Sequence, residues 1–146
     1  ITGNSMGKYY DIWALRINED IWNDNIHGKL WKSPLNFDCW DEHFRNFNNK
    51  IKDYQISIPT NFPIIPVNSA FGGIGIYKIS KIIGCRYSAL NNDIVTCEHI
   101  NFHNEIALKH NANICICPEY LVYKTITNTY LLSSNTTSHR ANMWNF

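Results

Sequence analysis

The stretch CEHINFHNEIALKHN (Cys97–Asn111), followed by ANICICP (Ala112–Pro118), decides the fold class. In the first part, Phe102 and Ile106 stand four residues apart, which is the spacing of one face of a helix. In the second part, side chains alternate with a period of two, as in a strand. A helix that runs directly into a strand indicates an α/β protein.

Further elements are predicted on the N-terminal side of this stretch. A helix over residues 38–54 is favoured because Asp38 can cap it and because its apolar residues repeat every three or four positions, at Trp40, Phe44, Phe47 and Ile51. Strands are expected at Tyr9–Arg16, Gln55–Pro59 and Cys85–Tyr87 and on both sides of Gly72-Gly73, with a loop over 17–35 and a short helix over 79–83. The prediction is a mixed sheet with flanking helices at 38–54 and 97–111.

Composition narrows the class of protein. The 146 residues are 45% hydrophobic and 17% charged, so a core of ordinary size can be buried. The net charge is +1 without a long run of one sign, which argues against a nucleic-acid surface. We expect one domain over residues 1–124 and a polar tail over 125–146, which is rich in Asn, Ser and Thr.

Cysteines and apolar runs bear on the compartment. The five cysteines are irregularly spaced and are expected to be small buried hydrophobes in a reducing compartment, with Cys115 and Cys117 on one face of a strand. The sequence has no run of about 18 or more apolar residues, which is the length needed to span a membrane. No signal peptide is recognisable either, so a cytoplasmic location is favoured.

Glycines follow an apolar segment at Gly72-Gly73-Ile74-Gly75. Glycine permits positive φ and lets the backbone approach a ligand closely. The spacing is neither that of a dinucleotide fingerprint nor that of a P-loop. A tight hairpin turn therefore explains these glycines as well as a ligand site does.

Two histidines stand close to an acidic residue at the start of the predicted 97–111 helix. His99 and His103 are four residues apart and would share a helix face, from which two imidazoles can bind one metal. Glu98 lies in the first turn, where the helix dipole favours a carboxylate. Surface histidines beside an N-terminal charge are the alternative.

The segment Tyr9–Arg16 combines a carboxylate with aromatic side chains. In an extended chain, Asp11 and Trp13 would share one face. A ring covers the C–H face of a sugar and a carboxylate accepts its hydroxyl hydrogen bonds. An ordinary core strand with one buried acid fits equally well.

Taken in order, YDIWALR (Tyr10–Arg16), PVNSAFGGIGIYK (Pro66–Lys78) and CEHINFH (Cys97–His103) resemble the distal half of GT-A-type glycosyltransferases. The pattern is similar to that of the capsule-associated α-1,3-mannosyltransferases and of related glycosyltransferase-like proteins of microbes and large DNA viruses. The resemblance covers roughly residues 8 to 123. It implies the C-terminal half of a GT-A fold, a nucleotide-sugar donor and a hydroxyl acceptor.

The resemblance also implies roles for particular residues. Glu98 would be the catalytic base, and His99 or His103 would contribute to a divalent metal site for Mn²⁺ or Mg²⁺. The residues implied to bind substrate are Asp11, Trp13, Arg16, Asn68, Ser69, Gly72 and Gly73. The family's Asp-x-Asp metal motif does not occur in this sequence. A fragment that is inactive alone is therefore expected.

Two other classes of protein are alternatives. A noncatalytic carbohydrate-binding module would suit the 14% aromatic content and would bind sugar without a nucleotide. A small metal-stabilised domain could use Cys97, His99 and His103 with either Cys115 or Cys117.

Overall fold

A computed structural model describes residues 1–23, 30–36, 52–91 and 94–123 of the chain. Within these ranges the elements follow in the order β1 (Thr2–Ser5), α1 (Glu19–Trp22), β2 (Ile65–Val67), a 3-10 turn (Ile79–Lys81), β3 (Leu90–Asn91), β4 (Ile94–Val95), α3 (Glu98–His110) and β5 (Ile114–Val122). The second predicted helix, over residues 38–54, lies outside the described residues except for its end, where residues 52–54 are helical. The predicted tail over 125–146 lies outside them entirely.

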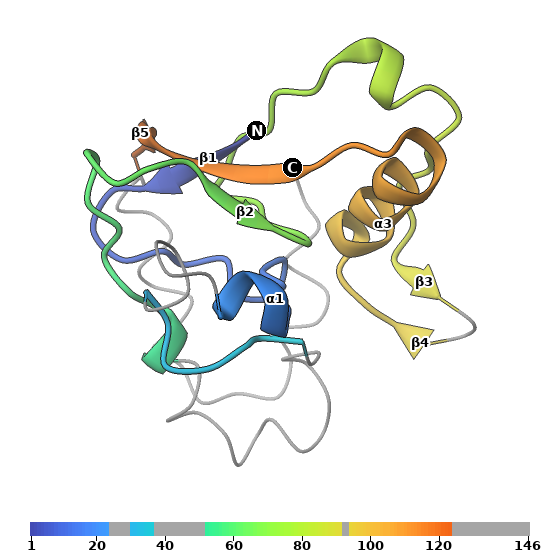
Figure 1. Cartoon of the computed structure of the whole chain (residues 1–146). Helices are drawn as coiled ribbons and strands as arrows, with labels where there is room; N and C mark the ends of the chain where they lie inside the picture. Colours follow the sequence, from blue (N-terminus) through green and yellow to red (C-terminus); the bar gives the residue numbers. More distant parts are fainter. Residues whose placement is uncertain (24–29, 37–51, 92–93, 124–146) are drawn as a thin grey trace, which may run out of the picture.

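A three-stranded mixed sheet organises the described residues. β5 is the central strand, with β1 parallel to it on one side and β2 antiparallel to it on the other (Figure 1). Ile116 is paired with both Thr2 and Ile65, so the three strands meet at this residue. The sheet with its helices confirms the expected mixed α/β class.

The alternation along β5 follows the predicted strand pattern. Ile114 and Ile116 are buried, whereas Cys115 and Cys117, which alternate with them, are only partly buried. The pairing of β1 with β5 shifts register between Thr2 and Asn4, and the irregularity spans Pro118. A proline fits at such a bulge because it has no N–H to donate.

Helix α3 begins and ends close to the predicted bounds. Phe102, His103 and Ile106 are buried and form the face that packs on the core. Its C-cap is Asn111, which has a φ of 45° and donates its backbone N–H to the carbonyl of Ala107. Asparagine is one of the few residues that adopt this left-handed conformation readily.

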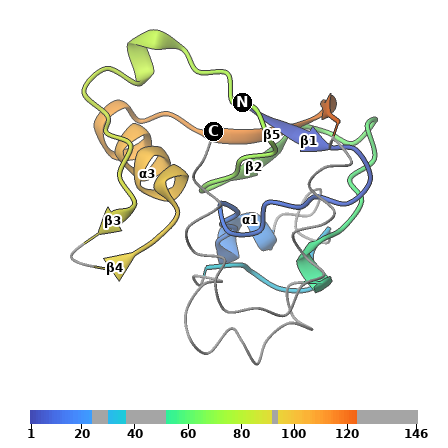
Figure 2. The same ribbon diagram turned by 180° about the vertical axis from the view of Figure 1, so that it is seen from behind.

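The core lies between the sheet and the segments packed against it. Figures 1 and 2 show α3 and the β3–β4 hairpin beside one end of the sheet, and α1 on the other side of the molecule, below the sheet. The buried apolar cluster includes Tyr9, Leu15, Trp31, Leu35, Ile65, Phe102, Ile106 and Ile116. Side chains of α3 and of the N-terminal third of the chain thus share one core.

The prediction of a strand at Tyr9–Arg16 is wrong. Residues 12–14 form a turn, in which the Leu15 N–H donates to the carbonyl of Ile12. The carboxylate of Asp11 accepts the N–H of Ala14 at 3.2 Å, and this side-chain contact closes the turn. The aromatic and β-branched residues of this segment favour a strand, but the hydrogen bond between Asp11 and Ala14 stabilises a turn instead.

Other local expectations also need correction. The loop expected over 17–35 contains α1, which Asn18 caps by accepting the N–H of Ile21. Residues 55–59 and 85–87 lack strand pairing. The helix expected over 79–83 is a 3-10 turn at Ile79–Lys81, and Gly84 follows with a φ of 74°.

Candidate functional site

Three segments distant in sequence converge at the N-terminal half of α3. The backbone of Arg16 forms an antiparallel bridge with Ser69, whose carbonyl accepts the Arg16 N–H at 2.9 Å. Ser69 is in turn hydrogen-bonded to His103, and the ring of Phe71 stacks on that of His99 with centroids 3.9 Å apart. The first two segments are therefore joined by a single bridge, between Arg16 and Ser69.

His103 lies at the centre of a buried polar chain. Its Nδ1 is 2.9 Å from Ser69 Oγ and its Nε2 is 2.8 Å from Tyr77 Oη. Its side chain is fully buried, and burial lowers the pKa of His103 to about 3. Because both ring nitrogens are occupied, His103 is a neutral structural group in this arrangement and is not available as a metal ligand.

Cys97, Glu98 and His99 gather three different ligand atoms at the start of α3. His99 Nδ1 lies 3.7 Å from Cys97 Sγ and 3.4 Å from Glu98 Oε1, and one ligand atom from each residue falls within 4.8 Å of the others. Cys97 and His99 are buried, and Glu98 is partly buried. Burial raises the pKa of the Cys97 thiol to about 12.

Asp11 is a second carboxylate, and it is electrostatically coupled to this cluster. Burial raises its pKa to about 6; the hydrogen bond from Ala14 and the charge of Arg16 oppose this rise, and the charge of Glu98 adds to it. The charge of Asp11 also contributes to the raised pKa of Cys97. Asp11, held by the hydrogen bond from Ala14, is thus electrostatically coupled to residues at the start of α3.

Aromatic rings enclose the imidazole of His99. Phe71 stacks on one side of it, and Tyr87 meets it edge-on with centroids 5.0 Å apart. Tyr87 also contacts Phe102 on the next turn of α3. These rings exclude water from His99, so burial lowers its pKa.

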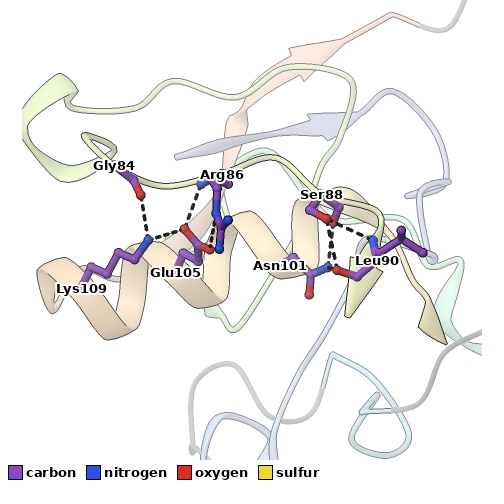
Figure 3. A network of polar contacts seen from close by, with 7 residues as sticks. All are labelled: Gly84, Arg86, Ser88, Leu90, Asn101, Glu105 and Lys109. Carbon is purple, nitrogen blue, oxygen red and sulfur yellow. Dashed lines mark hydrogen bonds and ion pairs between the residues drawn. The ribbon is translucent and has the colours of Figure 1, made fainter. Parts of the chain in front are cut away.

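Polar contacts along α3 hold the segment that carries Tyr87 (Figure 3). Lys109 Nζ donates to the carbonyl of Gly84 at 2.7 Å, and the Arg86 N–H donates to Glu105 at 2.9 Å. Asn101 Nδ2 donates to the carbonyl of Ser88 at 2.7 Å. Because these contacts lie on both sides of Tyr87, they fix its ring against the helix.

The glycine pair has a backbone role. A Cβ at Gly72 would lie 2.0 Å from the carbonyl oxygen of Gly3, so only glycine permits this approach to β1. Gly73 has a φ of 94°, which favours glycine. The sequence left open a turn or a ligand site at these glycines. The structure gives each glycine a backbone reason, which is a close approach at Gly72 and a positive φ at Gly73.

The remaining candidate residues also make structural contacts. Asn68 Oδ1 accepts the N–H of Asn18 at 3.0 Å. The guanidinium of Arg16 donates to the carbonyls of Trp13 and Leu15, and its charge lowers the pKa of Asp11. Trp13 is partly buried, and Ser69 is almost completely buried.

Phe71, Tyr77 and Tyr87 were not identified from the sequence as parts of this site, and Cys97 was named only as a ligand in the alternative metal-stabilised domain. Phe71 and Tyr77 stand within the glycine-containing segment, and Cys97 directly precedes Glu98. Their positions beside candidate site residues could therefore have indicated that they belong to the site. Nothing in the sequence indicated that Tyr87 belongs to the site, because its position depends on contacts between residues 84–90 and α3.

No protein-family model, curated protein or solved structure matches this chain. In the described part of the chain, no helix has the length and apolar character needed to cross a membrane.

Proposed function

We propose that this chain contributes the acceptor side of a glycosyltransferase site, where a glycosyl group passes from a nucleotide-sugar donor to a hydroxyl. The observation that carries the proposal is the convergence of the three segments that resemble such enzymes. They are joined by the Arg16–Ser69 bridge, the Ser69–His103 hydrogen bond and the stacking of Phe71 on His99.

The carboxylates of Asp11 and Glu98 supply the chemistry. Glycosyl transfer to a hydroxyl requires a group that removes the hydroxyl proton in an inverting reaction, and a general base works best when its pKa lies near the working pH. Asp11, with its pKa of about 6, and Glu98, whose charge acts on Asp11, form a pair suited to this role. Glu98 is the first candidate for the base, and Asp11 is its partner.

Substrate contact is assigned to the partly buried rim of the site. Trp13 and Asp11 are partly buried and stand in one turn, where a ring and a carboxylate together suit a sugar. Glu98 is also partly buried. Ser69, Gly72 and His103 are buried and act by holding the three segments in place.

The Mn²⁺ or Mg²⁺ implied by the resemblance does not fit the donor groups that the structure gathers. These ions prefer oxygen ligands in octahedral geometry. The described cluster offers one sulfur, one nitrogen and one carboxylate, and His103 has no free nitrogen. No catalytic step is therefore assigned to Mn²⁺ or Mg²⁺ in this part of the protein.

Ligand binding and turnover test the proposal. The natural full-length polypeptide that contains this sequence should bind a nucleotide-sugar and release its nucleotide. A panel of UDP- and GDP-sugars, the free nucleotides and the free sugars would be compared by calorimetry and by nucleotide-release assay. Binding of free sugars without any nucleotide dependence would instead identify a carbohydrate-binding module and would contradict the proposal.

A further inference from the structure

We propose that Cys97, Glu98 and His99 form a binding site for a zinc-class transition metal, with Cys97 Sγ, a Glu98 carboxylate oxygen and His99 Nδ1 as the three protein ligands. The site does not depend on the proposed glycosyl transfer. It differs from the Mn²⁺ or Mg²⁺ site expected from the sequence in its ligands and in the metal that it selects.

Two of the three distances between the ligand atoms match the edges of a zinc tetrahedron, and the third, from Cys97 to Glu98, is within 4.8 Å. Bonds of about 2.3 Å to sulfur, 2.0–2.1 Å to nitrogen and 2.0–2.2 Å to oxygen place sulfur and nitrogen about 3.6 Å apart, and oxygen and nitrogen about 3.4 Å apart. The Cys97 Sγ–His99 Nδ1 distance is 3.7 Å and the Glu98 Oε1–His99 Nδ1 distance is 3.4 Å. His99 Nδ1 therefore already lies at ligand spacing from both other donors.

The chemistry of the donors selects the metal. A thiolate with an imidazole and a carboxylate suits Zn²⁺, whereas Mg²⁺ and Ca²⁺ require oxygen ligands. Burial favours the neutral form of His99, which is the form that binds metal. On binding, the Cys97 thiol loses its proton to solvent as the metal–sulfur bond forms.

The surroundings of the cluster are consistent with a cation. Oε2 of Glu98 is buried and has no hydrogen-bond partner among the described residues. Asp11 adds a second negative charge that acts on both Cys97 and Glu98. The N-terminus of α3 opposes a cation through its dipole, but a thiolate and two carboxylates carry full charges and outweigh it.

Three protein ligands leave one position of a tetrahedral zinc open, as in catalytic zinc sites. Asp11 is a further carboxylate whose charge acts on Cys97 and Glu98. With metal bound, Glu98 is a ligand, and Asp11 then becomes the carboxylate that remains for proton transfer in the proposed function.

Cobalt substitution tests the site directly. The full-length protein, stripped with a chelator and titrated with Co²⁺, should bind one equivalent and develop a thiolate-to-cobalt charge-transfer band. Zn²⁺ should displace the cobalt. Cys97→Ser should abolish the band, and Cys97→Ser and His99→Gln should each weaken Zn²⁺ affinity by more than about 100-fold, since even the loss of an outer partner of a ligand costs about 10–100-fold.

Cys115→Ser and Cys117→Ser provide matched controls, because they make the same change on β5, outside the cluster. They should keep the band and the affinity. Circular dichroism checks that each variant is folded. If Cys97→Ser or His99→Gln does not fold, the Zn²⁺ affinity of Glu98→Gln, which alters the third ligand, is measured in its place. An absent charge-transfer band, or a band that survives Cys97→Ser, would overturn the proposal whether or not the protein transfers sugars.

Discussion

Ser69 Oγ lies 2.9 Å from Nδ1 of His103, and this buried hydrogen bond joins the glycine-containing segment to α3. Ser69 also pairs with Arg16 through its backbone. One small residue therefore connects all three segments that converge on the candidate site, and its contacts determine where the start of α3 lies.

Replacing Ser69 with alanine should destabilise the fold. The Ser69→Ala variant leaves Nδ1 of buried His103 without its partner, and an unsatisfied buried polar group costs about 1–3 kcal/mol. Urea unfolding measures this loss. Ser57→Ala, at an exposed position, is the control and should change stability by less than about 0.5 kcal/mol. Equal effects of the two substitutions would show that the hydrogen bond contributes nothing.

Acid should unfold the protein partly through His103. Burial, followed by the neighbouring His99, lowers its pKa from 6.5 to about 3. Between these values the unfolded chain binds a proton that the folded chain does not, so stability falls as the pH decreases from 6.5 towards 3. His103→Gln should flatten this part of the pH profile of unfolding free energy.

His110→Gln, on the last turn of the same helix, is the matched control for the pH profile. Its profile should keep the slope of the unaltered protein between pH 6.5 and 3, the window set by His103. A His103→Gln profile with the same slope as the unaltered protein would contradict the assignment of a buried neutral imidazole.

The sequence predicted those features that depend on local spacing. The periodicities of Cys97–Asn111 and Ala112–Pro118 indicated α3 and β5, and both are confirmed. The turn after Asp11 was missed because its aromatic and β-branched residues favour a strand, whereas one side-chain hydrogen bond decides the conformation. The parallel pairing of β1 with β5 has no local signal, since it joins distant segments.

The candidate site was predictable to a similar degree. Glu98 and His99 were identified from their place at a helix start, and the structure places them with Cys97 and couples Asp11 electrostatically to Glu98. The role of His103 could not be predicted, because spacing shows that two histidines share a face but not that Ser69 and Tyr77 occupy both nitrogens of one of them.

Gly72→Ala should destabilise the protein through its backbone. The added methyl group would stand 2.0 Å from the carbonyl oxygen of Gly3, so β1 must shift. Overpacking of this kind costs about 1–3 kcal/mol, and thermal unfolding measures it. Gly7→Asn should cost less, because no atom lies within 4 Å of that position and asparagine tolerates its φ of 82°. A stable Gly72→Ala variant that had lost ligand binding would favour a substrate role instead.

Turnover of the isosteric variants decides whether Asp11 and Glu98 act as a reactive carboxylate pair. In the natural full-length protein, Glu98→Gln and Asp11→Asn should each lower nucleotide release from the donor by about 10²–10⁴-fold. Their melting temperatures should stay close to that of Glu119→Gln, the same change at an exposed position of β5. Near-normal turnover with a lowered melting temperature would show that the pair is structural and would contradict the account.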